Sequence, residues 1–343
     1  MNPAHSIPKK PVIVLMVIAI ALVCGIMPTS AITITDDAGT VITLNATPTR
    51  IVSLAPSNTE ILAALGLLDR VVGVTDVCNY PPEVKNITHI GGYSAISIEK
   101  VVAARPDLVI ASDITPQETV SRLREIDLTV MVIAPRNIDD VIRDIRVVGN
   151  VTGTGIQADQ LSANLLNRIA AAVPSSSLSY RPTVAHVVWH DPLYVSGNDT
   201  LQNDVIVASG GTNIFSDKDG WNTVPLEEFL VRNPDIIIVS GGDGMDPWAK
   251  DVILDAFLTN PQYASLSAVK NKHIYSVNAD AISRAGPRIV DAIEQVAKII
   301  HTVNDERTAS QAGSVLQSTA KTPGFTVFAA IAGLITLALV RRF

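Results

Sequence analysis

Short, continuous apolar runs alternate with helix-like stretches twice along the central part of this chain. Runs of that kind are typical of parallel strands that are buried on both faces of a sheet. The expected strands are 51–55, 71–75, 108–112 and 130–134 in the first half, and 184–190, 193–196, 236–240 and 274–277 in the second. The expected helices are 58–67, 98–104, 117–124, 138–148, 204–209, 226–231, 252–258 and 288–303. This alternation predicts the α/β fold class, in two separate lobes.

A long amphipathic segment separates the two halves. Leu161, Leu165, Ile169 and Val173 recur every four residues, which places one apolar stripe along a helix. Pro174 and the serines that follow it end this helix. We therefore expect a first lobe over 32–152, a linker helix over 153–175 and a second lobe over 176–305.

One segment of the first lobe is echoed in the second. Glu99 lies seven residues before a Pro-Asp pair, and Glu227 lies seven residues before another, with an apolar run after each pair. A helix, Pro-Asp and a strand form a common junction in α/β folds, so the Pro-Asp pair alone carries little weight. The glutamate at the same offset supports two related lobes.

The first 31 residues are typical of a secretory signal peptide. Lys9 and Lys10 precede an apolar run over 12–26, and small residues suited to cleavage follow it. The run is shorter than the roughly 20 residues needed to span a bilayer, and a retained membrane helix is the alternative. Lipid attachment at Cys24 is a second alternative, which the preceding residues fit poorly.

The other end of the chain carries a second apolar segment. A polar spacer covers 306–322, and the tail over 323–343 begins with Pro-Gly-Phe, continues as an uncharged apolar run and includes Arg341 and Arg342. Such a tail is either a plain anchor or a sorting signal that is removed, and the arginines mark its cytoplasmic side. It resembles the PGF-type sorting signals of archaeal surface proteins, which implies exchange for a lipid anchor. In either case we expect the body to face outward.

Charge and cysteine content narrow the classes of function. The chain has 33 acidic and 26 basic residues, a net charge of −7, and the charged residues of its two terminal segments are all basic. The body is therefore more acidic still, and we expect no binding of nucleic acid, which basic residues drive. Cys78 is the single cysteine of the body, which excludes a disulfide framework and a cysteine zinc site. The sequons that suit an exported glycoprotein are at Asn45, Asn86, Asn150 and Asn198.

The sequence contains no recognisable catalytic motif. G-x-S-x-G, G-x-x-x-x-G-K-[ST] and H-E-x-x-H are all absent. His186 and His190 lie on one face of an expected strand, too far apart to share a metal easily. We therefore expect no catalytic residues, no metal site and no intrinsic cofactor. A hydrolase or metal-dependent oxidoreductase is the competing enzyme class, and a structural surface-layer protein is another alternative.

Several short stretches occur in a characteristic order between residues 50 and 300. They are RIVSLAPSNTE (50–60), VVGVT (71–75), NYPP (79–82), GGY (91–93), SGGTNIF (209–215) and SRAGPR (283–288), together with the two glutamate and Pro-Asp segments. With them the chain resembles the cobalamin- and iron-chelate-binding proteins of ATP-driven importers, the class III periplasmic binding proteins, and looks most like the cobalamin binders. The resemblance implies two Rossmann-like lobes joined by a single long helix, with the ligand held between the lobes.

The resemblance assigns the two echoed glutamates to a partner. Glu99 and Glu227 match lobe glutamates that pair with arginines of a dimeric ABC permease, which works with ATPase subunits. Contacts between arginine and carboxylate fix orientation as well as adding energy. The alternative is that each glutamate is only a solvated charge on a helix.

The resemblance also implies a set of ligand-binding residues. Tyr93, Tyr194 and Trp221 match aromatic residues of the ligand cleft, whose flat apolar area suits a corrin ring or a planar chelate. Asp280 and Arg284 match a segment that holds polar parts of cobalamin, and a local ion pair is their alternative role.

Two further candidates, Ser57 and Asn58, follow the first strand in a loop that faces the cleft in the family. Capping of the next helix could alone account for both. Trp189 is a weaker aromatic candidate because it lies within a strand-like run.

Two departures from the family leave the ligand open. The closest cobalamin binders carry a tyrosine where this chain has Val77, and a tryptophan near the position of Ser112. The acidic charge favours a neutral or cationic ligand over an anionic one. We expect an exported monomer, anchored at its C-terminus, that captures a corrinoid for import. A ferric siderophore or haem is the alternative ligand, and a non-transport surface protein is the lower alternative.

Overall fold

The computed structural model describes residues 31–173, 180–241 and 252–319. These residues form two compact units. One unit contains the chain up to Asn167 together with Ser283–Ile289, and the other contains Arg168–Ile282 and the chain from Val290 onward. The expected boundaries differ from these in two respects. The joining helix is divided between the units, and residues 283–289 belong to the first unit instead of the second.

The first unit is built on a parallel sheet with the strand order β4-β3-β7-β8. One face of this sheet packs its apolar side chains against Val101, Val120 and Leu123, which come from two helices. Both faces are buried, which explains why these strands are continuous apolar runs in the sequence. The elements are β1 (Ile32–Thr35), β2 (Val41–Leu44), β3 (Ile51–Ser53), α2 (Pro56–Ala64), η1 (Leu68–Arg70), β4 (Val71–Val74), η2 (Pro82–Asn86), β5 (Gly91–Gly92), β6 (Ala95–Ile96), α3 (Ile98–Ala103), β7 (Leu108–Ser112), α4 (Gln117–Glu125), β8 (Val130–Ile133), α5 (Ile138–Thr152) and the first part of α6 (Gly155–Ala172).

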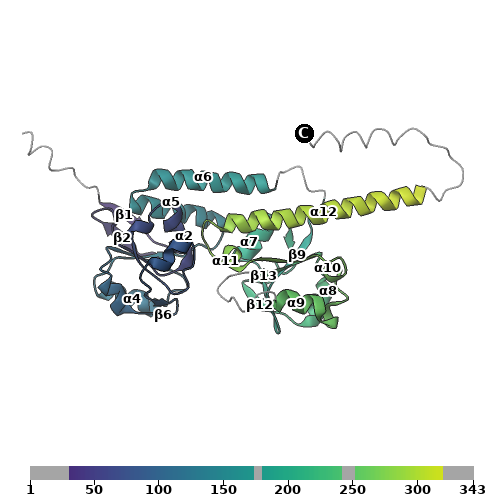
Figure 1. Cartoon of the computed structure of the whole chain (residues 1–343), viewed down its shortest axis with the longest axis horizontal. Helices are drawn as coiled ribbons and strands as arrows, with labels where there is room; N and C mark the ends of the chain where they lie inside the picture. The colour runs from purple at the N-terminus through teal and green to yellow at the C-terminus, as the bar shows by residue number, and fades with distance from the viewer. Residues whose placement is uncertain (1–30, 174–179, 242–251, 320–343) are drawn as a thin grey trace, which may run out of the picture. The chain divides into compact units, whose positions relative to one another are not determined.

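The second unit has a mixed sheet. Its strands β11, β9, β13 and β14 are parallel, and β10 and β12 extend the sheet in the antiparallel sense. Figure 1 shows α8, α9 and α10 on one side of β13, and α7 and α12 on the other. The elements are β9 (Thr183–His190), β10 (Leu193–Ser196), α7 (Leu201–Ala208), β11 (Thr212–Asn213), β12 (Trp221–Thr223), α8 (Leu226–Arg232), β13 (Ile236–Gly241), α9 (Val252–Thr259), η3 (Pro261–Tyr263), α10 (Ser267–Lys270), β14 (Ile274–Asn278), α11 (Ala279–Ser283) and α12 (Ile289–Thr319).

The two units repeat one arrangement of strands, which accounts for the echo in the sequence. The order β4-β3-β7-β8 corresponds to β11-β9-β13-β14, and α3 precedes β7 as α8 precedes β13. The aspartate of each Pro-Asp pair holds the start of the neighbouring strand. Asp107 accepts hydrogen bonds from the amides of Thr49 and Arg50 at 2.8 and 2.9 Å, and Asp235 accepts one from the amide of Thr183 at 2.8 Å. The repeated Pro-Asp segments therefore have the same role in both units: the aspartate, here called the strand clamp, bonds backbone amides at the start of the neighbouring strand.

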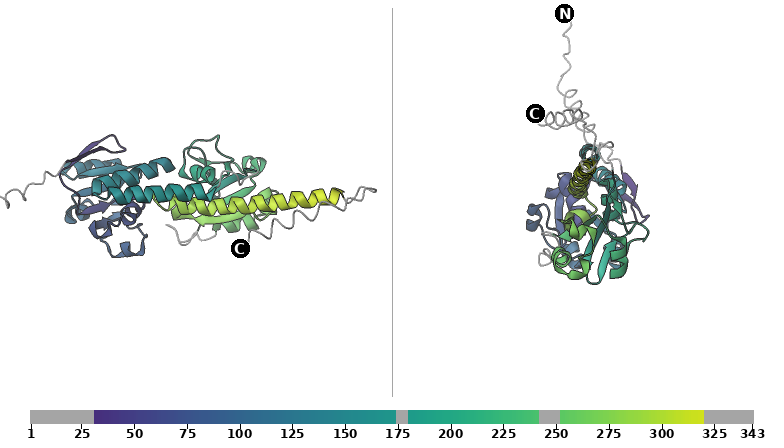
Figure 2. Two further views of the ribbon diagram at one scale, coloured as in Figure 1. Left: turned by 90° about the horizontal axis from the view of Figure 1, so that it is seen from above. Right: turned by 90° about the vertical axis from the view of Figure 1, so that its right-hand side faces the viewer.

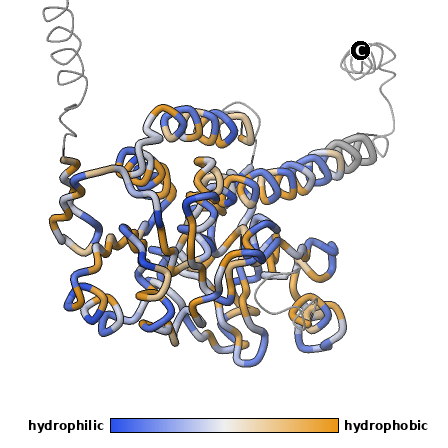
Figure 3. Tube along the Cα trace, turned by 60° about the vertical axis from the view of Figure 1, so that its left-hand side comes forward, coloured by the Kyte–Doolittle hydropathy of each residue, from blue (hydrophilic) through white to orange (hydrophobic). Residues whose placement is uncertain are grey.

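Helix α12 is longer than the sequence led us to expect. The expected helix ended at residue 303 and a polar spacer followed, but α12 continues to Thr319. No proline interrupts the polar segment before Pro323, so its Ala, Ser and Gln residues can continue the helix. Figure 2 shows α12 as one continuous helix, and Figure 3 shows polar and apolar residues alternating along it. At its start, Arg168 of α6 bonds Glu294 at 2.8 Å and Asp291 at 2.6 Å.

The expected strands are all present, and their ends differ from the prediction by two residues or fewer. The sequence reading missed the short strands β1, β2, β5, β6, β11 and β12, which have too few residues to show a period. Among the described residues, no helix combines the length and the apolar character needed to cross a membrane. The expected signal peptide and the expected C-terminal tail lie outside the described residues, apart from Ala31.

One buried acid in α5 makes the stability of the first unit depend on pH. Burial, together with the nearby charge of Asp37, raises the pKa of Asp144 to about 7, and the ion pair with Arg143 only partly opposes this. Asp140 is also close to Arg143 and adds negative charge. The folded state therefore holds a proton that the unfolded chain releases near pH 4.

We predict that the stabilisation from protonated Asp144 is complete below about pH 4 and is lost as the pH rises to about 7. Asp144→Asn removes this titration. The free energy of unfolding of the variant, relative to that of the parent, should therefore increase by about 2 kcal/mol between pH 5 and pH 8. Thermal unfolding of both proteins across this range measures the difference. Asp159→Asn, at an exposed position of α6, is the control and should give a constant difference. Parallel curves for Asp144→Asn and the parent would contradict the assignment.

Candidate functional site

Three of the predicted ligand residues lie where parallel strands end. Ser57 and Asn58 follow β3 in the first turn of α2, and Asp280 follows β14 in α11. The carboxyl ends of parallel strands are the usual binding edge of such folds. Asn58 and Asp280 are buried at this edge, so the binding role of these three residues stays a prediction.

Asn58 has a clear structural task at this edge. It is buried, and its Nδ2 donates to the carbonyl oxygens of Ala111 at 3.0 Å and Ile110 at 3.3 Å. These bonds attach α2 to the end of β7. Ser57, the preceding residue, is partly exposed, so it is the better placed of the two for contact with a ligand.

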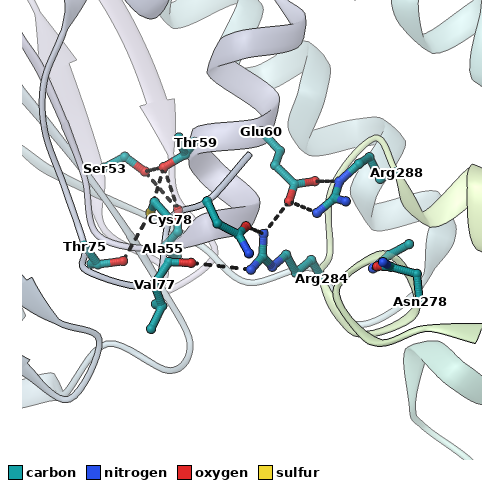
Figure 4. Close-up of polar contacts among 12 residues, drawn as sticks. Ser53, Ala55, Thr59, Glu60, Thr75, Val77, Cys78, Asn278, Arg284 and Arg288 are labelled. Atoms are coloured by element: carbon teal, nitrogen blue, oxygen red, sulfur yellow. Dashed lines mark hydrogen bonds and ion pairs between the residues drawn. The ribbon is translucent and has the colours of Figure 1, made fainter. Parts of the chain in front are cut away.

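A buried cluster of one glutamate and two arginines joins α2 to the segment 283–289 (Figure 4). Glu60, only 2% exposed, accepts from Arg284 Nη1 at 2.9 Å through Oε1. Arg288 reaches both oxygens of the same carboxylate, with Nε to Oε2 at 2.9 Å and Nη2 to Oε1 at 2.6 Å. Two guanidinium groups on one buried carboxylate form a strong and directional tie.

Further contacts of the cluster come from the loop after β4. Arg284, which is 7% exposed, also donates to Asn79 Oδ1 at 2.7 Å and weakly to the carbonyl oxygen of Val77 at 3.4 Å. The guanidinium of Arg288 lies over the ring of Tyr80, 4.2 Å from its centroid. Arg284 was predicted to bind the ligand, and the structure places it in contacts that hold the first unit together.

An exposed aromatic pair marks the second unit. Tyr194 on β10 and Trp221 on β12 stack with ring centroids 5.7 Å apart and an angle of 21° between the planes. The edge of His186 approaches Trp221 from within the sheet, at 6.1 Å between centroids. The structure therefore brings together two of the three predicted aromatic residues.

His186 lies beneath this pair as an uncharged group. Burial alone lowers its pKa to about 3, so the imidazole is neutral at physiological pH. Its Nε2 pairs with Ser240 Oγ at 3.0 Å, while Nδ1 has no hydrogen-bond partner among the described residues. Trp221 therefore packs against an uncharged group, which suits an apolar face of a ligand better than an anion.

Tyr93 and the two predicted docking glutamates occupy exposed positions. Tyr93 lies in the turn between β5 and β6. Glu99 and Glu227 are each the second residue of their helix, α3 and α8, and both side chains are exposed. Backbone hydrogen bonding, followed by the bond from Ser97 Oγ, lowers the pKa of Glu99, so this carboxylate stays ionised.

The pairing of Glu60 with Arg284 and Arg288 was not predicted from the sequence, and Trp189 was named only as a weaker aromatic candidate. The ion pairs of Glu60 span more than 220 positions, and nothing in a single sequence signals such a pairing. Trp189 is exposed although it lies within a strand-like run. The described residues contain no group of three or more His, Cys, Asp or Glu side chains that could hold a metal ion.

We predict that Glu60→Ala destabilises the first unit by about 3–5 kcal/mol, because the buried guanidinium of Arg284 and the partly buried guanidinium of Arg288 lose the carboxylate that they share. Glu60→Gln should cost less, since it keeps hydrogen-bond acceptor capacity. Hydrogen exchange measured by mass spectrometry should show faster exchange in α2 and in 283–289. Glu118→Ala, at an exposed position of α4, is the control and should change stability by less than about 0.5 kcal/mol. Unchanged exchange in Glu60→Ala would contradict the role of the cluster.

Comparison with known proteins identifies the family of this chain. The periplasmic binding protein profile matches residues 51–281, more than half of the chain. The chain is 31% identical over 278 residues to the uncharacterized ABC transporter substrate-binding lipoprotein YvrC of Bacillus subtilis, covering 79% of this chain and 85% of the relative.

Two solved structures are similar at 27% identity. The periplasmic heme-binding protein RhuT of Roseiflexus, in its apo form, has a TM-score of 0.67 and covers 74% of this chain and 98% of its own. The periplasmic vitamin B12 binding protein BtuF of Vibrio cholerae has a TM-score of 0.64 and covers 75% and 98%. The chain belongs to the periplasmic binding protein family and has the class III fold of its solute-binding members.

Proposed function

We propose that this protein is the solute-binding component of an ABC importer and that its ligand is a corrinoid. The observation that carries the proposal is the exposed stack of Tyr194 and Trp221. A stacked, solvent-exposed aromatic pair presents a large flat apolar area, which is complementary to a macrocyclic ring. Family relatives named for vitamin B12 and for heme support a ligand of this shape.

Charge favours the corrinoid over the other ligands of the class. The chain carries a net charge of −7, and the layer beneath the aromatic pair contains the neutral His186 instead of a cation. Arg284 and Arg288, the two arginines of the segment 283–289, bind Glu60. An anionic ferric siderophore or the propionates of haem would therefore gain little from these groups. A ferric siderophore or haem is the alternative ligand.

The proposal also includes the place of the protein in the cell. A cleavable signal peptide over 1–31 would export the chain, and the tail over 323–343 would hold it at the outer face of the cytoplasmic membrane. There it would act as a monomer that delivers its ligand to a dimeric permease. The sequons at Asn45, Asn86, Asn150 and Asn198 fit this exposed location.

Titration of the full chain with cyanocobalamin, dicyanocobinamide, hemin and ferrichrome in parallel tests the ligand. We expect tight one-to-one binding of the corrinoids, measured by calorimetry, and weaker binding of hemin and ferrichrome. Binding of hemin or ferrichrome alone would move the ligand to iron while leaving the transport role. Failure of all four to bind would favour a surface protein without a transport role.

Glu99 and Glu227 are the residues that we propose dock the permease. They occupy the same position in equivalent helices, one in each unit, and both are exposed. By contrast, the neighbouring Glu228 already pairs with Lys218 at 3.1 Å and with Arg232 at 2.8 Å. Exposed first-turn carboxylates can meet arginines of a partner without first breaking ion pairs of their own.

We predict that the double variant Glu99→Ala and Glu227→Ala binds its ligand as tightly as the parent but fails to support uptake. The reason is that neither glutamate belongs to the aromatic site. The matched control is Glu118→Ala with Asp255→Ala, which removes one first-turn acid from each unit. Uptake of labelled ligand by cells that express each variant is the measurement. Loss of ligand affinity in the first pair, or equal loss of uptake in both pairs, would rule out the docking role.

A further inference from the structure

We infer that Trp189 belongs to the ligand-binding surface and forms one continuous aromatic face with Tyr194 and Trp221. This inference rests on the proposed function, which supplies a ligand with a flat ring. It adds a residue whose position in a strand concealed its role. The pairing of β9 with β10 is irregular, and this irregularity decides which face of the sheet carries Trp189.

The pairing of β9 and β10 begins in the expected way. Val187 lies opposite Val195, and both are buried in the core on the side of α8, α9 and α10. Side chains alternate between the two faces of a strand. Regular alternation would therefore place Trp189, two residues after Val187, in the same core.

The register shift between Tyr194 and Val195 changes this outcome. Two positions along β9 correspond to a single position along β10, so Trp189 lies opposite Tyr194, and His190 lies opposite the buried Leu193. Residues that lie directly opposite in an antiparallel pair project from the same face. The bulge therefore turns Trp189 out of the core and onto the face that carries Tyr194. Bulges commonly re-aim a side chain in this way beside functional sites.

Exposure agrees with this placement. Trp189 is 44% exposed, Tyr194 36% and Trp221 40%, although each lies on a strand of the central sheet. Large aromatic side chains are normally among the more buried residues of a fold. Three neighbouring strands that each expose one such ring create an apolar surface that a planar ring can cover.

The orientation of Trp189 is fixed before any ligand binds. Its Nε1 donates to the carbonyl oxygen of Asp191 at 2.8 Å, and its ring lies against that of His190 at 5.2 Å between centroids. The polar atom of the indole is thus satisfied within the hairpin, so binding would cover the remaining apolar ring without burying an unpaired donor. A side chain that is already ordered also loses little entropy on binding.

The inference predicts that Trp189→Ala lowers the affinity of the full chain for cyanocobalamin about tenfold, by loss of one aromatic contact. Trp189→Phe should recover most of that loss, because a phenyl ring restores the flat apolar area. Leu258→Ala, which trims another exposed apolar side chain of the same unit, is the control and should bind like the parent. Equal affinity of Trp189→Ala and the parent would overturn the inference while leaving the proposed function intact.

A second measurement does not depend on affinity. The full chain labelled with 5-fluorotryptophan gives resonances that Trp→Phe variants at positions 189 and 221 assign. Addition of cyanocobalamin should shift both resonances, because both rings meet the ring of the ligand. A shift at Trp221 with none at Trp189 would exclude Trp189 from the site. If the parent bound no corrinoid, hemin would be used in the same way, and absence of binding by both would count against the proposed function itself.

Discussion

Burial of both faces of the parallel sheets is the constraint on which the rest of this structure depends. Neither β3 nor β13 leaves a face open to solvent along its length, so polar or ligand-binding side chains can lie only where the strands end. The carboxyl ends carry Ser57 and Asn58 in one unit and Asp280 in the other. The strand clamps of Asp107 and Asp235 set where each sheet begins, and thereby where these ends fall.

The antiparallel extension of the second sheet is the exception, and it carries the surface that we propose binds the ligand. β10 and β12 lie outside the parallel core, and one of their faces carries Tyr194 and Trp221. A single register shift adds Trp189 to the same face. Among the described residues of the first unit, the sheet has four strands with no antiparallel extension beside β4, and the candidate aromatic Tyr93 lies in a turn. The cores of the two units have the same strand arrangement, but the exposed side chains at their edges differ.

The sequence predicted those features that follow from local pattern and composition. The apolar runs located the main strands, the four-residue spacing located α6, and the repeated Glu and Pro-Asp segment located α3 and α8. It did not predict the features that depend on contacts between distant residues. The pairing of Glu60 with Arg288 joins segments separated by more than 220 positions, and the bulge that exposes Trp189 depends on how two strands pair. The length of α12 was not predicted, because a polar, alanine-containing segment has no strong secondary-structure preference of its own.

The Glu60 cluster decides which of the predicted polar residues can serve a ligand. A ligand that drew Arg284 away from Glu60 and Asn79 would leave Glu60 with one partner fewer in a buried environment. Breaking such a pair costs about 3–5 kcal/mol, whereas a new hydrogen bond to a charged group returns about 1.5–3 kcal/mol. The exchange is unfavourable unless the ligand makes several contacts at once. The energetics therefore favour a structural role for Arg284, and Ser57 is the more accessible of the predicted polar residues in the first unit.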